Sequence, residues 1–239
     1  MARSLTEQAI DRIREFVRSG RFPAGARLPP ENELASELGI SRSPTREAVK
    51  ALSLARVLEV RRGDGTYVTS LAPSLLLEGL GSAVSLMSGN TIVELTEVRR
   101  LLEPAATGVA ASRITDEQLA VVRGHLDAMY DAVDDVERLT VLDAAFHQAV
   151  IAATGNETLA TLLDGISSRT LRARIWRGNA EHAVTTVTLA QHSAIYEALA
   201  NRDPQVATAA ALMHVDTSER WLREHLADED IPTDVVAPE

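Results

Sequence analysis

The chain has 239 residues, enough for one large domain or two smaller ones. Hydrophobic residues make up 45% of it, yet no uncharged run is long enough for a membrane-spanning helix, so we expect a soluble globular protein with no membrane partner. The charged N-terminal segment lacks the apolar core of a secretion signal, and zero cysteines exclude disulfides and thiol chemistry. We therefore expect a cytoplasmic protein.

The net charge of −10 is unevenly distributed along the chain. Residues 1–70 contain 12 basic and 9 acidic residues, a net charge of +3, whereas residues 71–239 contain 12 basic and 25 acidic residues, a net charge of −13. A basic segment joined to an acidic one predicts that only the first part approaches nucleic-acid phosphate.

The first 70 residues have the pattern of three helices and a hairpin. Apolar residues recur at helical spacing over 4–19, a short helix over 31–38 ends at Gly39, and Ser41 stands at the N-cap of a third helix that runs to about residue 55. The segment LEVRRGDGTYV then alternates around a glycine-containing turn, which predicts a β-hairpin. This order predicts a winged helix-turn-helix over residues 1–70.

The third helix, in ISRSPTREAVKAL, carries the candidate DNA-reading residues. Ala48, Val49 and Leu52 can pack inward, which leaves Arg42, Ser43 and Arg46 on the opposite face near the helix N-terminus. That end of a recognition helix enters the major groove, where arginine can bind guanine O6 and N7 in a bidentate manner or contact phosphate. An ordinary solvated helix face is the alternative interpretation.

After residue 70 the pattern is helical throughout. We predict a linker at 71–74, an all-α antiparallel bundle over 75–226, and a disordered acidic tail at 227–239. Seven helices are expected in this part of the chain, at about 74–88, 91–111, 115–134, 137–153, 156–176, 180–200 and 203–225. The fold class is thus mostly α.

Four residues of the bundle form a candidate metal site. Asp143 and His147 are four apart and share one helix face, and His192 and His214 lie on two later helices. Three helices can bring one carboxylate oxygen and three imidazole nitrogens together, a donor set suited to Zn²⁺, Ni²⁺, Mn²⁺ or Fe²⁺. Scattered histidines are otherwise core or surface residues.

The run GRFPAGARLPPENELASELGISRSPTREAVKALSLARVLEVRRGDGTYV resembles the DNA-binding domain of the GntR regulators. The resemblance implies that Arg42 and Arg46 read the operator and that the wing follows the minor groove or the backbone. Thr45 stands where the family usually has an aliphatic residue, and Arg56 where it usually has glycine. The complete predicted DNA-binding set is Asn32, Ser41, Arg42, Ser43, Arg46, Gly63 and Gly65.

Residues 93–225 resemble the FCD ligand-binding domain of the FadR-type subfamily, through VRRLLEPAATGVAA, DAAFHQAVIAATGNETL and QHSAIYEALANRDPQVATAAALMHV. The resemblance implies that Asp143, His147, His192 and His214 hold a divalent metal, for which zinc is our first choice. It also implies a small organic acid as effector, with Arg99 as the effector-binding residue. An intrahelical pair between Arg99 and Glu103 is the alternative, and Arg172 and Arg174 are further candidates.

These features predict a homodimeric, ligand-responsive transcriptional regulator, acting as a repressor on double-stranded operator DNA. Two winged helices must lie roughly 34–36 Å apart to read a two-fold site. One alternative is a regulator that responds to the metal itself. Another is a metallohydrolase, but only Ala144, Ala145 and Phe146 separate Asp143 from His147, so the glutamate base of an H-E-x-x-H site is missing and we expect no enzyme.

Overall fold

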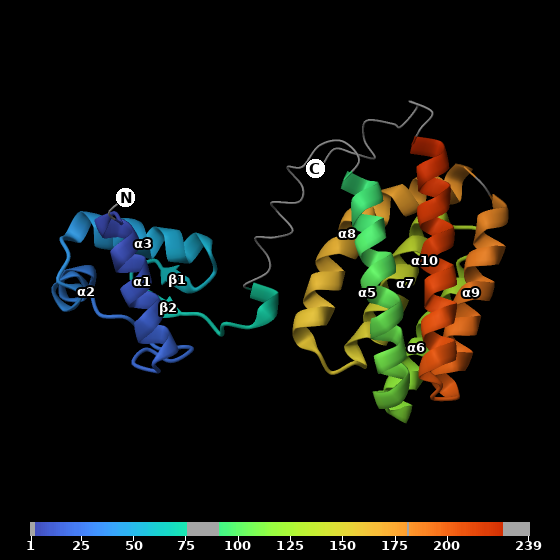
Figure 1. The fold of residues 1–239 in the computed structure, drawn as a ribbon, viewed down its shortest axis with the longest axis horizontal. Coiled ribbons are helices and arrows are strands. Elements are labelled where there is room, and N and C mark those ends of the chain that lie inside the picture. Colours follow the sequence, from blue (N-terminus) through green and yellow to red (C-terminus); the bar gives the residue numbers. More distant parts are fainter. Residues whose placement is uncertain (1–2, 76–90, 181, 227–239) are drawn as a thin grey trace. The chain divides into compact units, whose positions relative to one another are not determined.

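The computed structural model describes residues 3–75, 91–180 and 182–226 (Figure 1). The chain divides into two compact units, Met1–Leu80 and Gly81–Glu239. Helices dominate the described residues, and the two strands β1 and β2 form the only sheet among them, which confirms the predicted mostly α fold class. The predicted linker at 71–74 stays a prediction, and the predicted helix at 74–88 and the tail at 227–239 lie almost entirely outside the described residues.

The first unit contains the predicted three helices and hairpin: α1 (Leu5–Arg18), α2 (Glu31–Leu38), α3 (Arg42–Leu54), β1 (Leu58–Arg61) and β2 (Gly65–Val68). Helix α1 begins at a capping box, in which the Ser4 hydroxyl accepts from the Glu7 N–H and the Glu7 carboxylate accepts from the Ser4 N–H. Helix α2 ends at Gly39, whose φ of 61° is the left-handed conformation that glycine adopts easily.

The core of this unit lies where α3 packs on α1 and α2. Ala48, Val49 and Leu52 are buried there, as predicted, together with apolar residues of the other two helices. Thr45 is also fully buried, and its hydroxyl donates to the Ser41 carbonyl at 3.1 Å. A threonine is therefore tolerated at this aliphatic position because its polar group is hydrogen-bonded.

Strands β1 and β2 pair antiparallel, with Leu58 opposite Val68. Arg56, in the turn that precedes β1, has a φ of 57°. This left-handed conformation costs an L-residue roughly 1–2 kcal/mol and costs glycine little, which explains why the family favours glycine there. Thr69 supports the turn by donating its hydroxyl to the Arg56 carbonyl at 2.8 Å.

The second unit is a helical bundle, and six of the seven predicted helices fall within its described residues. They are α5 (Thr91–Arg113), α6 (Asp116–Asp131), α7 (Val136–Ala152), α8 (Glu157–Ala180), α9 (His182–Ala200) and α10 (Pro204–Leu226). The predicted end of α8 at residue 176, before Gly178 and Asn179, is wrong, since the helix continues to Ala180. One glycine costs a helix only about 1 kcal/mol, which favourable neighbouring interactions can offset.

Long helices of this bundle pack along one another, and α5 and α10 lie side by side (Figure 1). A Cβ added at Gly108 of α5 would lie 3.0 Å from the Pro204 carbonyl oxygen, which explains how the two backbones approach closely there. The main core joins residues of α5, α6, α7, α9 and α10. Among the described residues, no helix combines the length and hydropathy needed to cross a membrane.

Candidate functional site

The predicted DNA-reading residues lie on an exposed face of the first unit. Ser41 is at the N-cap of α3 with an extended backbone, although its side chain makes no capping hydrogen bond. Arg42, Ser43 and Arg46 follow on the exposed side of the helix. The Arg46 Nε lies 3.1 Å from the Glu31 carboxylate on α2, and both side chains are partly exposed. Asn32 is exposed on the same short helix.

The hairpin tip has a structural role that the sequence did not predict. Gly65 has a φ of 151°, and the Nε of Arg27 lies 2.7 Å from where a Cβ on Gly65 would be. The same guanidinium donates to the Asp64 carbonyl. Gly65 therefore makes room for Arg27, whereas the sequence suggested only close approach to the DNA backbone. The turn also contains Gly63, with a φ of 76°.

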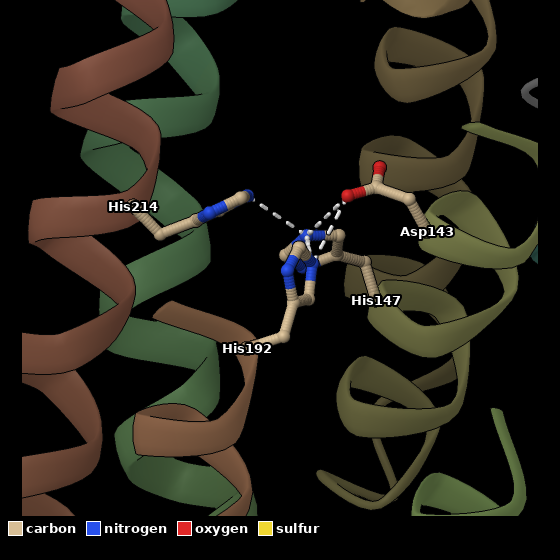
Figure 2. A group of neighbouring side chains, drawn as sticks. All are labelled: Asp143, His147, His192 and His214. Atoms are coloured by element: carbon tan, nitrogen blue, oxygen red, sulfur yellow. Dashed lines mark hydrogen bonds and ion pairs between the residues drawn. The ribbon is translucent and has the colours of Figure 1, made fainter. Parts of the chain in front are cut away.

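In the second unit, the four predicted metal ligands come together inside the bundle. Asp143 and His147 project from one face of α7, His192 comes from α9 and His214 from α10, and their side chains point toward a common position (Figure 2). One donor atom from each lies within 4.8 Å of the other three, and all four residues are buried.

The histidines meet through their Nε2 atoms. The Nε2 of His147 lies 3.1 Å from the Nε2 of His214 and 3.1 Å from the Nε2 of His192. The Asp143 Oδ1 lies 3.0 Å from the His192 Nε2 and 3.8 Å from the His147 Nε2. Phe146 packs edge-on against the His192 ring at 4.7 Å between centroids and restricts its rotation.

Hydrogen bonds at the outer nitrogens determine which nitrogen carries the proton. The His192 Nδ1 lies 2.7 Å from the Thr188 carbonyl, which can only accept, so this nitrogen donates and the Nε2 faces the centre. His214 Nδ1 lies 3.1 Å from the Gln191 Oε1. The Gln191 amide nitrogen donates to Thr217 at 3.0 Å, and that hydroxyl donates to a backbone carbonyl, which fixes the amide with its oxygen toward His214.

Two imidazole lone pairs and a carboxylate oxygen thus converge around His147. Burial, followed by the neighbouring His192 and His147, lowers the pKa of His214 well below its ordinary value, so this ring is neutral at pH 7. Three imidazoles, two of them oriented by outer hydrogen bonds, together with one carboxylate match the donor set of a Zn²⁺, Ni²⁺, Mn²⁺ or Fe²⁺ site. The residues present therefore fit a divalent transition metal.

Arg99 lies beside this cluster and does form the pair with Glu103. Its Nε and Nη2 donate to the two Glu103 oxygens at 2.6 and 3.2 Å, and its Nη1 donates to the Thr170 hydroxyl at 3.3 Å. Both charged side chains are 2% exposed. Burial alone lowers the pKa of Arg99, but Glu103 and then Asp143 raise it above its ordinary value, so the guanidinium stays charged.

Glu103 also reaches the cluster of Asp143 and the three histidines, which the sequence did not predict. Its Oε2 lies 4.0 Å from the His147 Nδ1, and the Ser167 hydroxyl donates to its Oε1 at 3.3 Å. In the sequence, the four-residue spacing of Arg99 and Glu103 indicated that these two side chains could pair. No local pattern indicated that Glu103 lies against His147. The side chains of Arg172 and Arg174 lie outside the described residues.

Comparison with known families divides the chain in the same way. Residues 5–68 match the bacterial regulatory proteins of the gntR family, and residues 94–217 match the FCD domain. The first of these families consists of regulatory proteins, and the relatives named below are transcriptional regulators, which confirms the expectation that the protein is not an enzyme.

Similar proteins extend this match over nearly the whole chain. The galactonate operon transcriptional repressor of Escherichia coli (strain K12) is 31% identical over 94% of this chain and 99% of its own. The HTH-type transcriptional regulator LutR of Bacillus subtilis (strain 168) is 31% identical over 85% and 94%. A solved structure described as Streptococcus agalactiae GntR covers 90% of this chain and 99% of its own at 32% identity, with a TM-score of 0.65. The chain therefore belongs to the gntR family of bacterial regulatory proteins, in the FadR-type subfamily whose C-terminal domain is an FCD domain.

Proposed function

We propose that the protein is a cytoplasmic, homodimeric repressor whose helical unit binds a divalent metal, preferably zinc, and a small organic acid. The wing and α3 bind operator DNA, and Asp143, His147, His192 and His214 hold the metal. The metal supplies a Lewis-acidic centre to which a carboxylate can bind. One relative is named for the galactonate operon, and galactonate is a sugar acid with a single carboxylate, which supports an acid as effector.

The convergence of four buried donors next to a buried arginine carries this proposal. Glu103 occupies the Nε side of the Arg99 guanidinium, and among the described residues the Nε, Nη1 and Nη2 groups donate to Glu103 and Thr170. Nη1 and Nη2 each carry a second N–H group, and arginine uses such groups to bind carboxylates. The intrahelical pair and an effector-binding role for Arg99 are therefore compatible.

Operator titration with protein tests the proposal directly. Fluorescence anisotropy is measured for the metal-loaded protein, for the chelator-treated protein, and for each in the presence of candidate acids. We expect an acid to weaken operator binding about 5–150-fold, the range of typical coupling free energies, and only when the metal is bound. An effect of the metal that is the same with and without acids would instead favour a regulator that responds to the metal alone.

Arg46→Ala is expected to weaken operator binding by about 1–3 kcal/mol, because one bidentate base contact is lost. Metal content and the unfolding transition should not change, since the Arg46 side chain is half exposed. Arg18→Ala is the matched control. Arg18 is an exposed arginine on α1 of the same unit, and it pairs with Glu15 of the same helix. Anisotropy that is unchanged for Arg46→Ala would exclude the reading role.

The full chain is expected to be a dimer in solution and residues 1–70 alone a monomer that binds the operator weakly. Dimerisation through the bundle sets the spacing of the two DNA-reading helices. Exposed apolar residues, such as Leu101 on α5 and Met213 on α10, offer contact area for this association. Light scattering measures both masses, and a monomeric full chain at micromolar concentration would contradict the proposed dimer.

A further inference from the structure

We infer that Gln191 and Thr217 position the ring of His214 for metal binding. Thr217 holds the Gln191 amide with its oxygen toward the outer nitrogen of the ring, so that the inner Nε2 is the atom that meets the metal. The inference rests on the proposed function, because it concerns the same site, and it adds two residues that are not ligands themselves. Both are positioning residues, which act on the metal only through His214.

Hydrogen bonds connect these residues across α9 and α10. The Nδ1 of His214 on α10 lies 3.1 Å from the Gln191 Oε1 on α9. The Gln191 Nε2 donates to the Thr217 hydroxyl oxygen at 3.0 Å, and this hydroxyl donates to the Met213 carbonyl oxygen at 2.7 Å. Met213 directly precedes His214, so the path of contacts begins and ends beside the same ring.

The Met213 carbonyl gives this path its direction. A carbonyl oxygen can only accept, so it takes the single hydroxyl proton of Thr217, and the hydroxyl oxygen accepts from the Gln191 amide nitrogen. The amide oxygen is thereby left facing His214. With the amide turned the other way round, its oxygen would face the hydroxyl oxygen, and one hydrogen bond of the path would be lost.

This direction matters for the metal-loaded protein. A neutral imidazole has one N–H group and one lone pair, so a ring that binds a metal through Nε2 carries its proton on Nδ1. The Nε2 of His214 lies 3.1 Å from the Nε2 of His147, where the four candidate ligands meet. The Gln191 oxygen can accept the Nδ1 proton, whereas an amide nitrogen in its place would oppose one donor with another.

The dependence on a side chain is particular to His214 and does not extend to His192. The outer nitrogen of His192 faces the Thr188 carbonyl of its own helix at 2.7 Å, and a backbone carbonyl within a helix has a fixed direction. A side-chain amide can turn over. The orientation of His214 therefore depends on Thr217, which makes no hydrogen bond to any of the four candidate ligands.

Zinc titration of the full chain against a competing chelator tests the inference. Gln191→Leu removes the acceptor at a similar side-chain volume. It is expected to lower zinc affinity by about 10–100-fold, the usual effect of losing an outer partner of a metal-binding histidine. Gln191→Glu keeps an oxygen acceptor and should have at least the wild-type affinity, which a mere disturbance of helix packing would not produce.

Thr217→Val is the sharper variant, because it keeps the shape of threonine and removes only the group that distinguishes the two amide orientations. Zinc affinity should fall on the order of 10-fold, and Thr217→Ser should retain the wild-type value. Thr208→Val is the matched control. Thr208 lies more than two helical turns before Thr217 on α10, and its hydroxyl donates to the Pro204 carbonyl at 2.7 Å in the same way.

Long-range proton–nitrogen NMR spectra of the zinc-loaded protein give a second readout, because they report which ring nitrogen carries the proton. The wild-type protein should carry the His214 proton on Nδ1, and a proton on Nε2 would overturn the inference. Unchanged zinc affinity in a folded Gln191→Leu would also overturn it, as would equal affinities of Thr217→Val and Thr208→Val should Gln191→Leu fail to fold. A wild-type protein that binds no zinc contradicts the proposed function itself, and this inference fails with it.

Discussion

Replacing His192 with alanine is expected to remove the bound metal. His192 is fully buried, and its Nε2 lies within 3.1 Å of donor atoms of Asp143 and His147, so its loss leaves a gap in the cluster. Loss of an outer-sphere partner alone typically costs about 10–100-fold in metal affinity, and loss of a direct ligand should exceed this. Elemental analysis of the purified variant, and zinc titration against a competing chelator, measure the effect.

His125→Ala is the control for this prediction, because His125 is a half-buried histidine on α6 that does not belong to the cluster. It should keep full metal content. Asp143→Asn should show a smaller loss than His192→Ala, since an amide oxygen can coordinate without supplying charge. A wild-type protein that stays metal-free after purification without chelator and incubation with divalent ions would refute the metal site.

Arg99→Ala is expected to lower the free energy of unfolding by about 3–5 kcal/mol, because it leaves the Glu103 carboxylate buried and without its charged partner. Both side chains are 2% exposed, and the two hydrogen bonds between them join Nε and Nη2 to the two carboxylate oxygens. Denaturant unfolding of the metal-free protein measures the change. Arg123→Ala, which breaks an exposed pair with Asp127 four residues away, should have little effect.

A double variant tests whether this loss of stability comes from the unpaired Glu103 charge. Arg99→Leu combined with Glu103→Leu removes both charges and should recover most of the stability lost in Arg99→Ala, as replacement of buried ion pairs by apolar residues often does. Arg99→Lys keeps the charge but loses the planar fork, so it is the better probe of carboxylate binding. A stable Arg99→Ala protein would show that Glu103 finds another partner or becomes neutral.

The buried pair changes how a functional test of Arg99 should be interpreted. Loss of acid binding in Arg99→Ala alone could follow from local disorder around Glu103 and His147, which lie 4.0 Å apart at Oε2 and Nδ1. Metal content measured in the same variant distinguishes the two causes, because disorder at His147 would also release the ion. An acid-binding loss with full metal content is the result that supports direct contact.

Local sequence determined much of this protein by itself. Helix limits could be predicted wherever a cap or a breaker stands at the end, as with Gly39 after α2 and Thr115 before α6, because these residues act through contacts within one turn. The exception is the end of α8, where Gly178 weakens a helix without stopping it. The four-residue spacings of Asp143 with His147 and of Arg99 with Glu103 likewise fixed which side chains share a face.

Only the tertiary structure decided how these faces meet. Packing of α7, α9 and α10 brings the three Nε2 atoms together, and the contact of Gln191 with His214 crosses from α9 to α10. The same packing sets Glu103 of α5 against His147 of α7 and thereby joins the ion pair to the cluster of candidate metal ligands. Side-chain positions along one helix follow from its fixed geometry, whereas distances between helices depend on how all of their buried faces fit at once.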